Sequence, residues 1–101
     1  MDIDDIKEKV RNGRYKISFT HTERLRQRRI GIRELEEAIV TGEIIERYPA
    51  DPRGPSCLIL GHTQRNRPLH MVCGIMEEDL LVITAYEPGS DEWKPDWRTR
   101  R

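Results

Sequence analysis

The sequence has few cysteines, few aromatic residues and no long apolar run, and these shortages exclude several classes of protein. Cys57 and Cys73 are too few for a disulfide framework, and both lie in apolar runs where buried reduced thiols are typical. No apolar stretch approaches the roughly 20 residues of a membrane span, and the amino terminus is acidic, so we expect a cytoplasmic protein. A chain of 101 residues with 36% hydrophobic and 36% charged residues predicts one small domain over residues 1–101.

Motifs of common cofactor and hydrolase sites are also missing. There is no glycine-rich phosphate loop, and no Gly-x-Ser-x-Gly sequence is present. The three histidines and two cysteines include no Cys-x-x-Cys and no His-x-x-x-His pair. The sequence therefore predicts neither a metal site nor a bound cofactor.

The 18 basic and 18 acidic residues cancel in total, but they are arranged in blocks. Residues 11–33 contain eight basic residues and one acidic residue, which gives a net charge of +7, and residues 52–75 and 93–101 each carry +3. The three intervening segments are acidic. Because local potential depends on where charges meet, the basic segments could converge into one face. The alternative is a surface of mutually paired charges.

Hydrophobic periodicity predicts helices early in the chain and strands later. We expect helices at residues 2–10, 21–29 and 32–41, the second starting at His21 because Thr20 and Glu23 have capping-box spacing. The expected strands are 43–48, 57–61, 69–76 and 80–86, with a short strand or extended entry at 14–19. This order predicts an α+β fold in which the helices pack on one face of a mainly antiparallel sheet of about four strands.

One stripe of the helix expected at 21–29 carries His21, Arg24 and Arg28. Like charges at this spacing cost a few tenths of a kcal/mol, so the stripe indicates a role other than helix stability. Guanidinium groups match phosphate geometry, and the helix amino terminus adds partial positive charge. The alternative is that the two arginines pair with the next helix through Glu34, Glu36 or Glu37.

His70 is a second candidate, on a predicted strand. Alternation places it on the same face as Gly74, which would leave open space, and the neighbouring strand offers Thr84 and Tyr86 as polar partners. The alternative is an ordinary buried strand histidine.

The last residues of the chain combine aromatic and basic side chains. Trp93 and Trp97 occur with Arg98, Arg100 and Arg101, a composition that suits unstacked RNA bases and their phosphates. The alternative is that the two tryptophans clamp the tail onto the body of the domain.

The ordered motifs resemble the DUF4258 family of small bacterial and archaeal proteins. The shared pieces are His21-Thr-x-Arg24-x-x-x-Arg28, Ile32-x-x-Leu35, Gly42-Glu-Ile-Ile-Glu-x-Tyr48, Arg67-Pro-Leu-His70 and Ile83-Thr-Ala-Tyr86-Glu-Pro88, followed by Trp93. The resemblance covers about residues 15–97. It implies an outline like that of the RelE/ParE-like toxins and, by association, a small zinc-finger antitoxin as partner.

The resemblance implies a toxin-like ribonuclease, and joined with these residues it predicts a metal-independent endoribonuclease that uses the ribose 2′-hydroxyl as nucleophile. His21 and His70 would be the acid and base in unassigned order, because an imidazole with an ordinary pKa of about 6.5 serves both roles near neutral pH. Arg24 and Arg28 would stabilise the phosphorane, and Tyr86 would orient the phosphate or stack a base. We expect further RNA contacts from Arg67, Trp93 and Arg98.

A non-catalytic module is the alternative function. Its basic helix would dock a nucleic acid or an acidic protein, and salt-dependent RNA affinity without cleavage would favour it.

Overall fold

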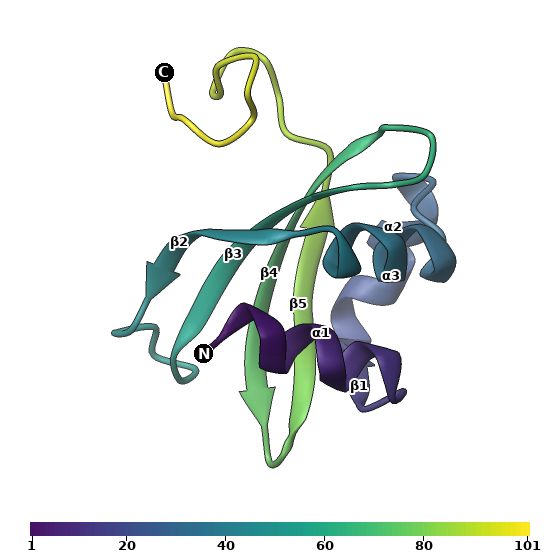
Figure 1. The fold of residues 1–101 in the computed structure, drawn as a ribbon, viewed down its shortest axis with the longest axis vertical. Coiled ribbons are helices and arrows are strands. Elements are labelled where there is room, and N and C mark those ends of the chain that lie inside the picture. The colour runs from purple at the N-terminus through teal and green to yellow at the C-terminus, as the bar shows by residue number, and fades with distance from the viewer.

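The later part of the chain forms most of a five-stranded sheet in a computed structural model that describes residues 1–101 (Figure 1). The strands are β1 (Tyr15–Ile17), β2 (Glu43–Tyr48), β3 (Ser56–His62), β4 (Pro68–Met76) and β5 (Asp79–Tyr86). Their order across the sheet is β1-β5-β4-β3-β2, with β1 parallel to β5 and all other pairs antiparallel. The α+β class is confirmed, but the expected count of about four strands is too low because the short segment after the first helix joins the sheet.

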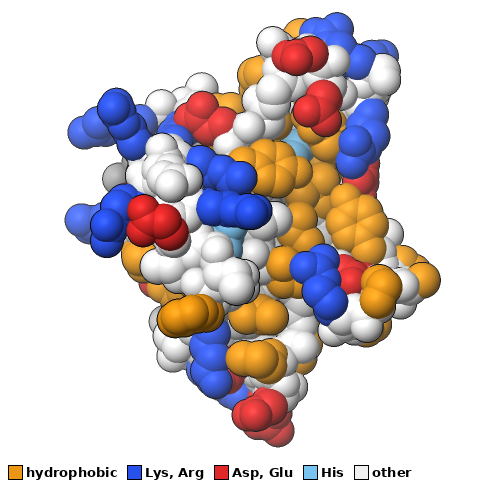
Figure 2. Space-filling model, turned by 180° about the vertical axis from the view of Figure 1, so that it is seen from behind, with side chains coloured by type: hydrophobic (Ala, Val, Ile, Leu, Met, Phe, Trp, Pro, Cys, Tyr) orange, Lys and Arg blue, Asp and Glu red, His pale blue; other side chains and the backbone are white.

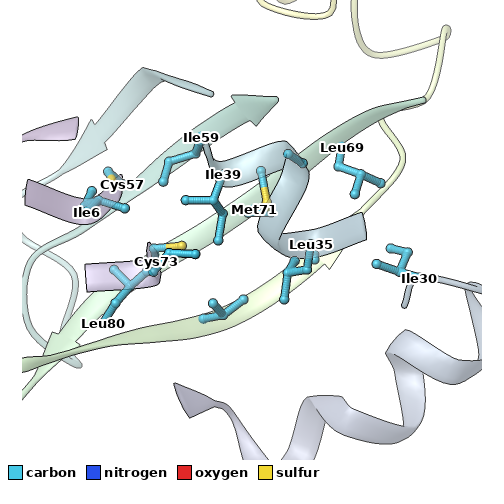
Figure 3. Packing of buried hydrophobic residues seen from close by; sticks show 14 of the residues in the cluster. Ile6, Ile30, Leu35, Ile39, Cys57, Ile59, Leu69, Met71, Cys73 and Leu80 are labelled. Carbon is cyan, nitrogen blue, oxygen red and sulfur yellow. The ribbon is translucent and has the colours of Figure 1, made fainter. Parts of the chain in front are cut away.

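Two of the three helices cover one face of this sheet (Figure 1). Both α1 (Ile3–Arg11) and α3 (Ile32–Val40) present an apolar stripe, and α3 packs mainly on β3. The buried cluster between helices and sheet includes the side chains shown in Figure 3, among them Ile6, Leu35, Ile39, Cys57, Ile59, Met71, Cys73 and Leu80. Both cysteines are free thiols in this core, as predicted. None of the helices has the length and apolar character needed to cross a membrane.

The third helix, α2 (Thr22–Gln27), lies at the edge of the sheet and starts differently from the prediction. A short 3₁₀ turn, η1 (Phe19–His21), precedes it, and the predicted capping box of Thr20 and Glu23 is wrong: no side chain caps the amino terminus of α2. The reason is that the segment continues the sheet: the Ser18 N–H donates to the Val82 carbonyl at 2.9 Å before the chain turns away. One half of a capping box occurs instead at α3, where the Glu34 carboxylate accepts from the Gly31 N–H at 3.1 Å.

The contact between α3 and β3 depends on the absence of a side chain at Gly61. A Cβ placed there would lie 1.7 Å from the Ala38 carbonyl oxygen, so the helix backbone rests directly on the strand. At Gly74, on β4, a Cβ would be 3.5 Å from its nearest neighbours, which is ordinary van der Waals contact. Only the first glycine is therefore required for packing.

We expect Gly61→Ala to destabilise the protein by about 1–3 kcal/mol or more, because overpacking forces α3 away from the sheet. Gly74→Ala is the matched control on the adjacent strand and should cost less than about 1 kcal/mol. Urea denaturation of both variants measures the difference. Equal stability of the two would contradict the close helix-to-strand contact.

Candidate functional site

The outer edge of β5 continues beyond the end of β1, and two side chains occupy it. The β1 strand pairs only with residues 80–82 of β5. Further along, the Ala85 N–H donates to His21 Nε2 at 2.8 Å, and the Ala85 carbonyl accepts from Arg28 Nη1 at 2.7 Å. Since unpaired backbone groups at a buried edge are costly, these contacts complete the sheet and fix α2 against it.

His21 is neutral in this arrangement. The residue is 3% exposed, and its Nε2 lone pair accepts the Ala85 N–H, which leaves the proton on Nδ1. Burial lowers the pKa of His21 below its ordinary value, the contact with the Ala85 backbone opposes this in part, and the nearby charges of Arg28 and Arg24 lower the pKa further. A neutral imidazole is therefore the resting form near neutral pH.

Beside His21 is a hollow of about 350 Å³, which we call the arginine pocket. It is lined by Ser18, Thr20, His21, Arg24, Arg53, Val72, Ile83 and Thr84. The lining thus contains two guanidinium groups, an imidazole and three hydroxyl groups, and it contains no carboxylate. Figure 2 shows Lys and Arg side chains next to a strip of hydrophobic side chains on the side of the molecule opposite the view of Figure 1. Such a lining is suited to an anion.

A β-bulge in β5 shapes the floor of this pocket. Val72 pairs with Thr84 whereas Cys73 pairs with Val82, so Ile83 is an extra residue in β5. Bulges of this kind re-aim side chains. Here Ile83 and Thr84, adjacent in sequence, both reach the arginine pocket.

The two arginines of the pocket differ in how they are held. Arg53 belongs to the β2–β3 loop, and Asp51 binds its Nε and Nη2 at 3.2 and 3.1 Å, which leaves Nη1 without a protein partner. These contacts with Arg53, together with the Ser56 hydroxyl, hold the pKa of Asp51 well below its usual range. Arg24 makes no salt bridge, and the alternative pairing with α3 does not occur because Glu34 binds Arg67 instead. Both arginines thus have donors available to an anion.

His70 lies outside the arginine pocket and is fully buried. Its Nε2 donates to the Trp97 carbonyl at 2.6 Å, and its ring meets the Trp93 ring edge-on at 4.5 Å. Nδ1 is also buried and has no hydrogen-bond partner. Burial lowers the pKa of His70, because protonation of Nδ1 would place a charge in this enclosed site. The structure therefore does not bring His21 and His70 together as a pair around one cavity.

The tail after β5 holds His70 in place. Trp93 is 3% exposed, and the Arg100 guanidinium lies 4.5 Å from its ring centroid. Arg98 pairs with Glu43 at 3.0 Å and Arg100 with Glu46 at 2.8 Å, both acids on β2. The Trp93 ring thus clamps the tail onto the domain, as the alternative prediction expected, whereas Trp97 contributes its backbone carbonyl to His70. The RNA contacts predicted for Trp93 and Arg98 remain a prediction.

Arg67 and Tyr86 border a second hollow of about 300 Å³ together with Arg28 and Glu87. All three guanidinium nitrogens of Arg67 are engaged: Nη1 donates to the Arg29 carbonyl at 2.7 Å, Nη2 to the Arg28 carbonyl at 2.8 Å, and Nε to Glu87. Arg67 thus ties the end of α2 to the start of β4. Tyr86 is half-buried, with its ring 5.6 Å from that of His70.

The sequence alone did not identify Arg53 or Phe19. Arg53 lies between Pro52 and Gly54 in a loop, where no periodic pattern indicates its direction. Alternation predicted Phe19 on the same side as Tyr15 and Ile17, but the η1 turn begins at this residue and its side chain is 94% exposed. Both neighbours of Phe19, Ser18 and Thr20, line the arginine pocket.

Comparison with known proteins gives one match. The family DUF4258, described as a domain of unknown function, matches residues 17–87, which include α2, α3 and all strands except part of β1. No curated protein and no solved structure matches the chain. In the structure, no three His, Cys, Asp or Glu side chains are placed to hold a metal ion.

We expect the free energy of unfolding to fall as the pH falls from 7.5 to 5.5. The pKa values of His21 and His70 are both lowered by folding, so the unfolded chain takes up protons first, below its ordinary pKa of about 6.5. The variant His70→Gln retains a donor for Trp97 but does not titrate, so its stability should change less over this range. Urea denaturation at several pH values gives the slopes, and an unchanged slope in the variant would contradict the buried neutral His70.

Proposed function

The chain belongs to the DUF4258 family, and we propose that it binds single-stranded RNA, with a backbone phosphate in the arginine pocket and a base stacked on Phe19. The observation that carries this proposal is the composition of the pocket lining, in which cationic and hydroxyl groups converge without a carboxylate. Guanidinium and hydroxyl donors of this kind match phosphate oxygens.

The position of Phe19 favours unpaired nucleotides over a duplex. Phe19 is 94% exposed, more than any other large apolar residue of the chain, and it is flanked in sequence on both sides by residues of the pocket. Single-stranded nucleic acids combine phosphate contacts with stacking of bases on aromatic rings. A base attached to a phosphate in the pocket would find such a ring next to it.

The distribution of charge supports the same surface. Arg24 and Arg28 come from the basic segment 11–33, and Arg53 and Arg67 come from the basic segment 52–75; all four line the two hollows beside α2 and β5. The third basic segment is used differently, since Arg98 and Arg100 pair with acids of β2 and Arg101 donates to backbone carbonyls of the tail. Two of the three basic segments therefore supply the proposed RNA surface.

Endoribonuclease activity is a second candidate, favoured by the presence of His21 in the same pocket as Arg24. The imidazole would take the 2′-hydroxyl proton, the 2′-oxygen would attack phosphorus, and the 5′-oxygen would leave with a proton. The lone pair of His21 is already occupied by the Ala85 N–H, and His70 is outside the pocket. Because no free base and no second histidine are present in the pocket, RNA binding is proposed ahead of cleavage. RNA ends with 2′,3′-cyclic phosphate, absent with His21→Ala, would instead establish cleavage.

A toxin-like role forms part of this second candidate. It would include a RelE-like arrangement, a cytoplasmic location and an antitoxin of the zinc-finger type that covers the arginine pocket. A neighbouring reading frame that encodes a small Cys-x-x-Cys protein, and a stable complex of the two proteins that no longer binds RNA, would support it.

We expect Arg24→Gln to weaken binding of a single-stranded RNA by about tenfold or more, because a hydrogen bond to a charged group contributes about 1.5–3 kcal/mol. The slope of log affinity against log salt should also decrease by about 0.7, the value for one phosphate contact. Arg26→Gln is the matched control on the same helix, outside the pocket. Fluorescence anisotropy at several salt concentrations measures both quantities. Equal losses in the two variants would mean that the arginine pocket is not the RNA site.

We expect Phe19→Ala to reduce affinity for single-stranded RNA by about 1–3 kcal/mol, or roughly 5- to 150-fold, through loss of base stacking. The fold should not change, since Phe19 is almost fully exposed. Ile32→Ala removes another exposed apolar side chain, at the start of α3, and should leave the affinity unaltered. Affinity of Phe19→Ala equal to wild type would exclude the stacking role.

A further inference from the structure

The arginine pocket adjoins a second, smaller hollow on the same face of the sheet. This hollow, the apolar slot, has a volume of about 110 Å³ and is lined by Ser18, Arg53, Gly54, Pro55, Gly74, Ile75, Leu81 and Ile83. Three of these residues, Ser18, Arg53 and Ile83, also line the arginine pocket. The two hollows are therefore the cationic and apolar halves of one depression.

We propose that this depression is a binding site for one nucleoside monophosphate, either free or as the phosphorylated end of an RNA strand. The inference deepens the proposed RNA binding and depends on it for the role of the arginine pocket. The phosphate would lie between Arg24 and Arg53, and the base would lie in the apolar slot against Ile83 and Leu81. Small-molecule sites typically combine apolar walls with a few placed polar groups in volumes of about 300–1,000 Å³.

The cationic half offers enough positive charge for a phosphate monoester as well as for an internal diester. A monoester carries about −1.5 to −2 charges at neutral pH, whereas a diester in a strand carries one. The pocket offers two guanidinium groups, and Asp51 holds the guanidinium of Arg53 in place while leaving Nη1 available. The Ser18 and Thr20 hydroxyls hydrogen-bond each other at 3.2 Å, so one of the two keeps a free O–H donor beside the arginines. A doubly charged terminal phosphate would use both arginines.

The apolar half exists because β4 has no side chain at Gly74. Gly74 pairs with Leu81 on β5 and with Ser56 on β3, so it lies within the sheet. A Cβ built on it would be 3.5 Å from Ile83 Cδ1 and 3.5 Å from the Pro55 carbonyl oxygen. The missing side chain thus leaves a gap between the β2–β3 loop and the bulge of β5. A flat base with no charge is the part of a nucleotide that such a gap accepts.

Binding of three probes to the wild-type protein tests the inference first. Isothermal titration calorimetry with AMP, adenosine and inorganic phosphate should show AMP binding at least tenfold more tightly than either of the others. Adenosine or phosphate with the affinity of AMP would overturn the inference, because one half of the depression would then contribute nothing.

Two variants separate the halves. Arg24→Gln should weaken both AMP and phosphate, whereas Gly74→Val should weaken AMP at least tenfold and leave phosphate within twofold, since it fills only the slot. Gly74→Ala replaces Gly74→Val if the larger residue prevents folding, because its Cβ makes ordinary contacts. Arg26→Gln is the control for lost charge. Unchanged AMP affinity in the folded Gly74 variant would overturn the placement of the base.

Two RNAs of one sequence, with a 5′-phosphate or a 5′-hydroxyl, distinguish the two sources of the nucleotide. At least tenfold tighter binding of the phosphorylated strand supports recognition of a strand end, and equal binding together with tight AMP binding supports a free nucleotide. If AMP does not bind while RNA binding still depends on Arg24, the inference is wrong and the proposed function stands. If AMP binds but Arg24→Gln leaves RNA binding unchanged, the proposed RNA function fails instead.

Discussion

The capture of the Ala85 backbone by His21 and Arg28 is the interaction on which the functional face depends. Because β1 is only three residues long, β5 would otherwise leave an unpaired N–H and carbonyl at the edge of the sheet. The two side chains replace a strand at this edge and hold α2 against β5. With α2 fixed in this way, Arg24 lies over the bulge of β5, where Arg53 approaches from the β2–β3 loop.

The candidate residues identified from the sequence fall into two groups: those that stabilise the fold and those that are available to a ligand. His21 and Arg28 complete the sheet, Arg67 ties α2 to β4, and His70 supports the tail; all are engaged with other parts of the chain. Among the candidate arginines identified from the sequence, Arg24 alone has no hydrogen-bond or ion-pair partner for its side chain. An anion would therefore bind to the Arg24 guanidinium and to Nη1 of Arg53. The residues that are bonded to other parts of the chain fix the positions of these two guanidinium groups.

Much of the fold could be predicted from the sequence, because strands with a buried face alternate and turn residues end them. The predicted bounds of β2 match the structure, and β3 to β5 differ by one residue at some ends. The start of α2 was mispredicted because a tertiary contact, His21 with Ala85, outweighed a local capping signal. Only part of the arginine pocket could be predicted. Helical spacing identifies Arg24 in the sequence. Arg53 lies in a loop and Thr84 follows a β-bulge, and neither feature produces a periodic pattern in the sequence.

The most direct test of the central claim is a map of amide chemical shifts during titration with a short single-stranded RNA. We expect the largest changes at residues 18–24, at Arg53 and its neighbours, and at Ile83 and Thr84. Changes confined to β2 and to residues 93–101 would contradict the claim, because the RNA would then bind at the clamped tail rather than at the arginine pocket.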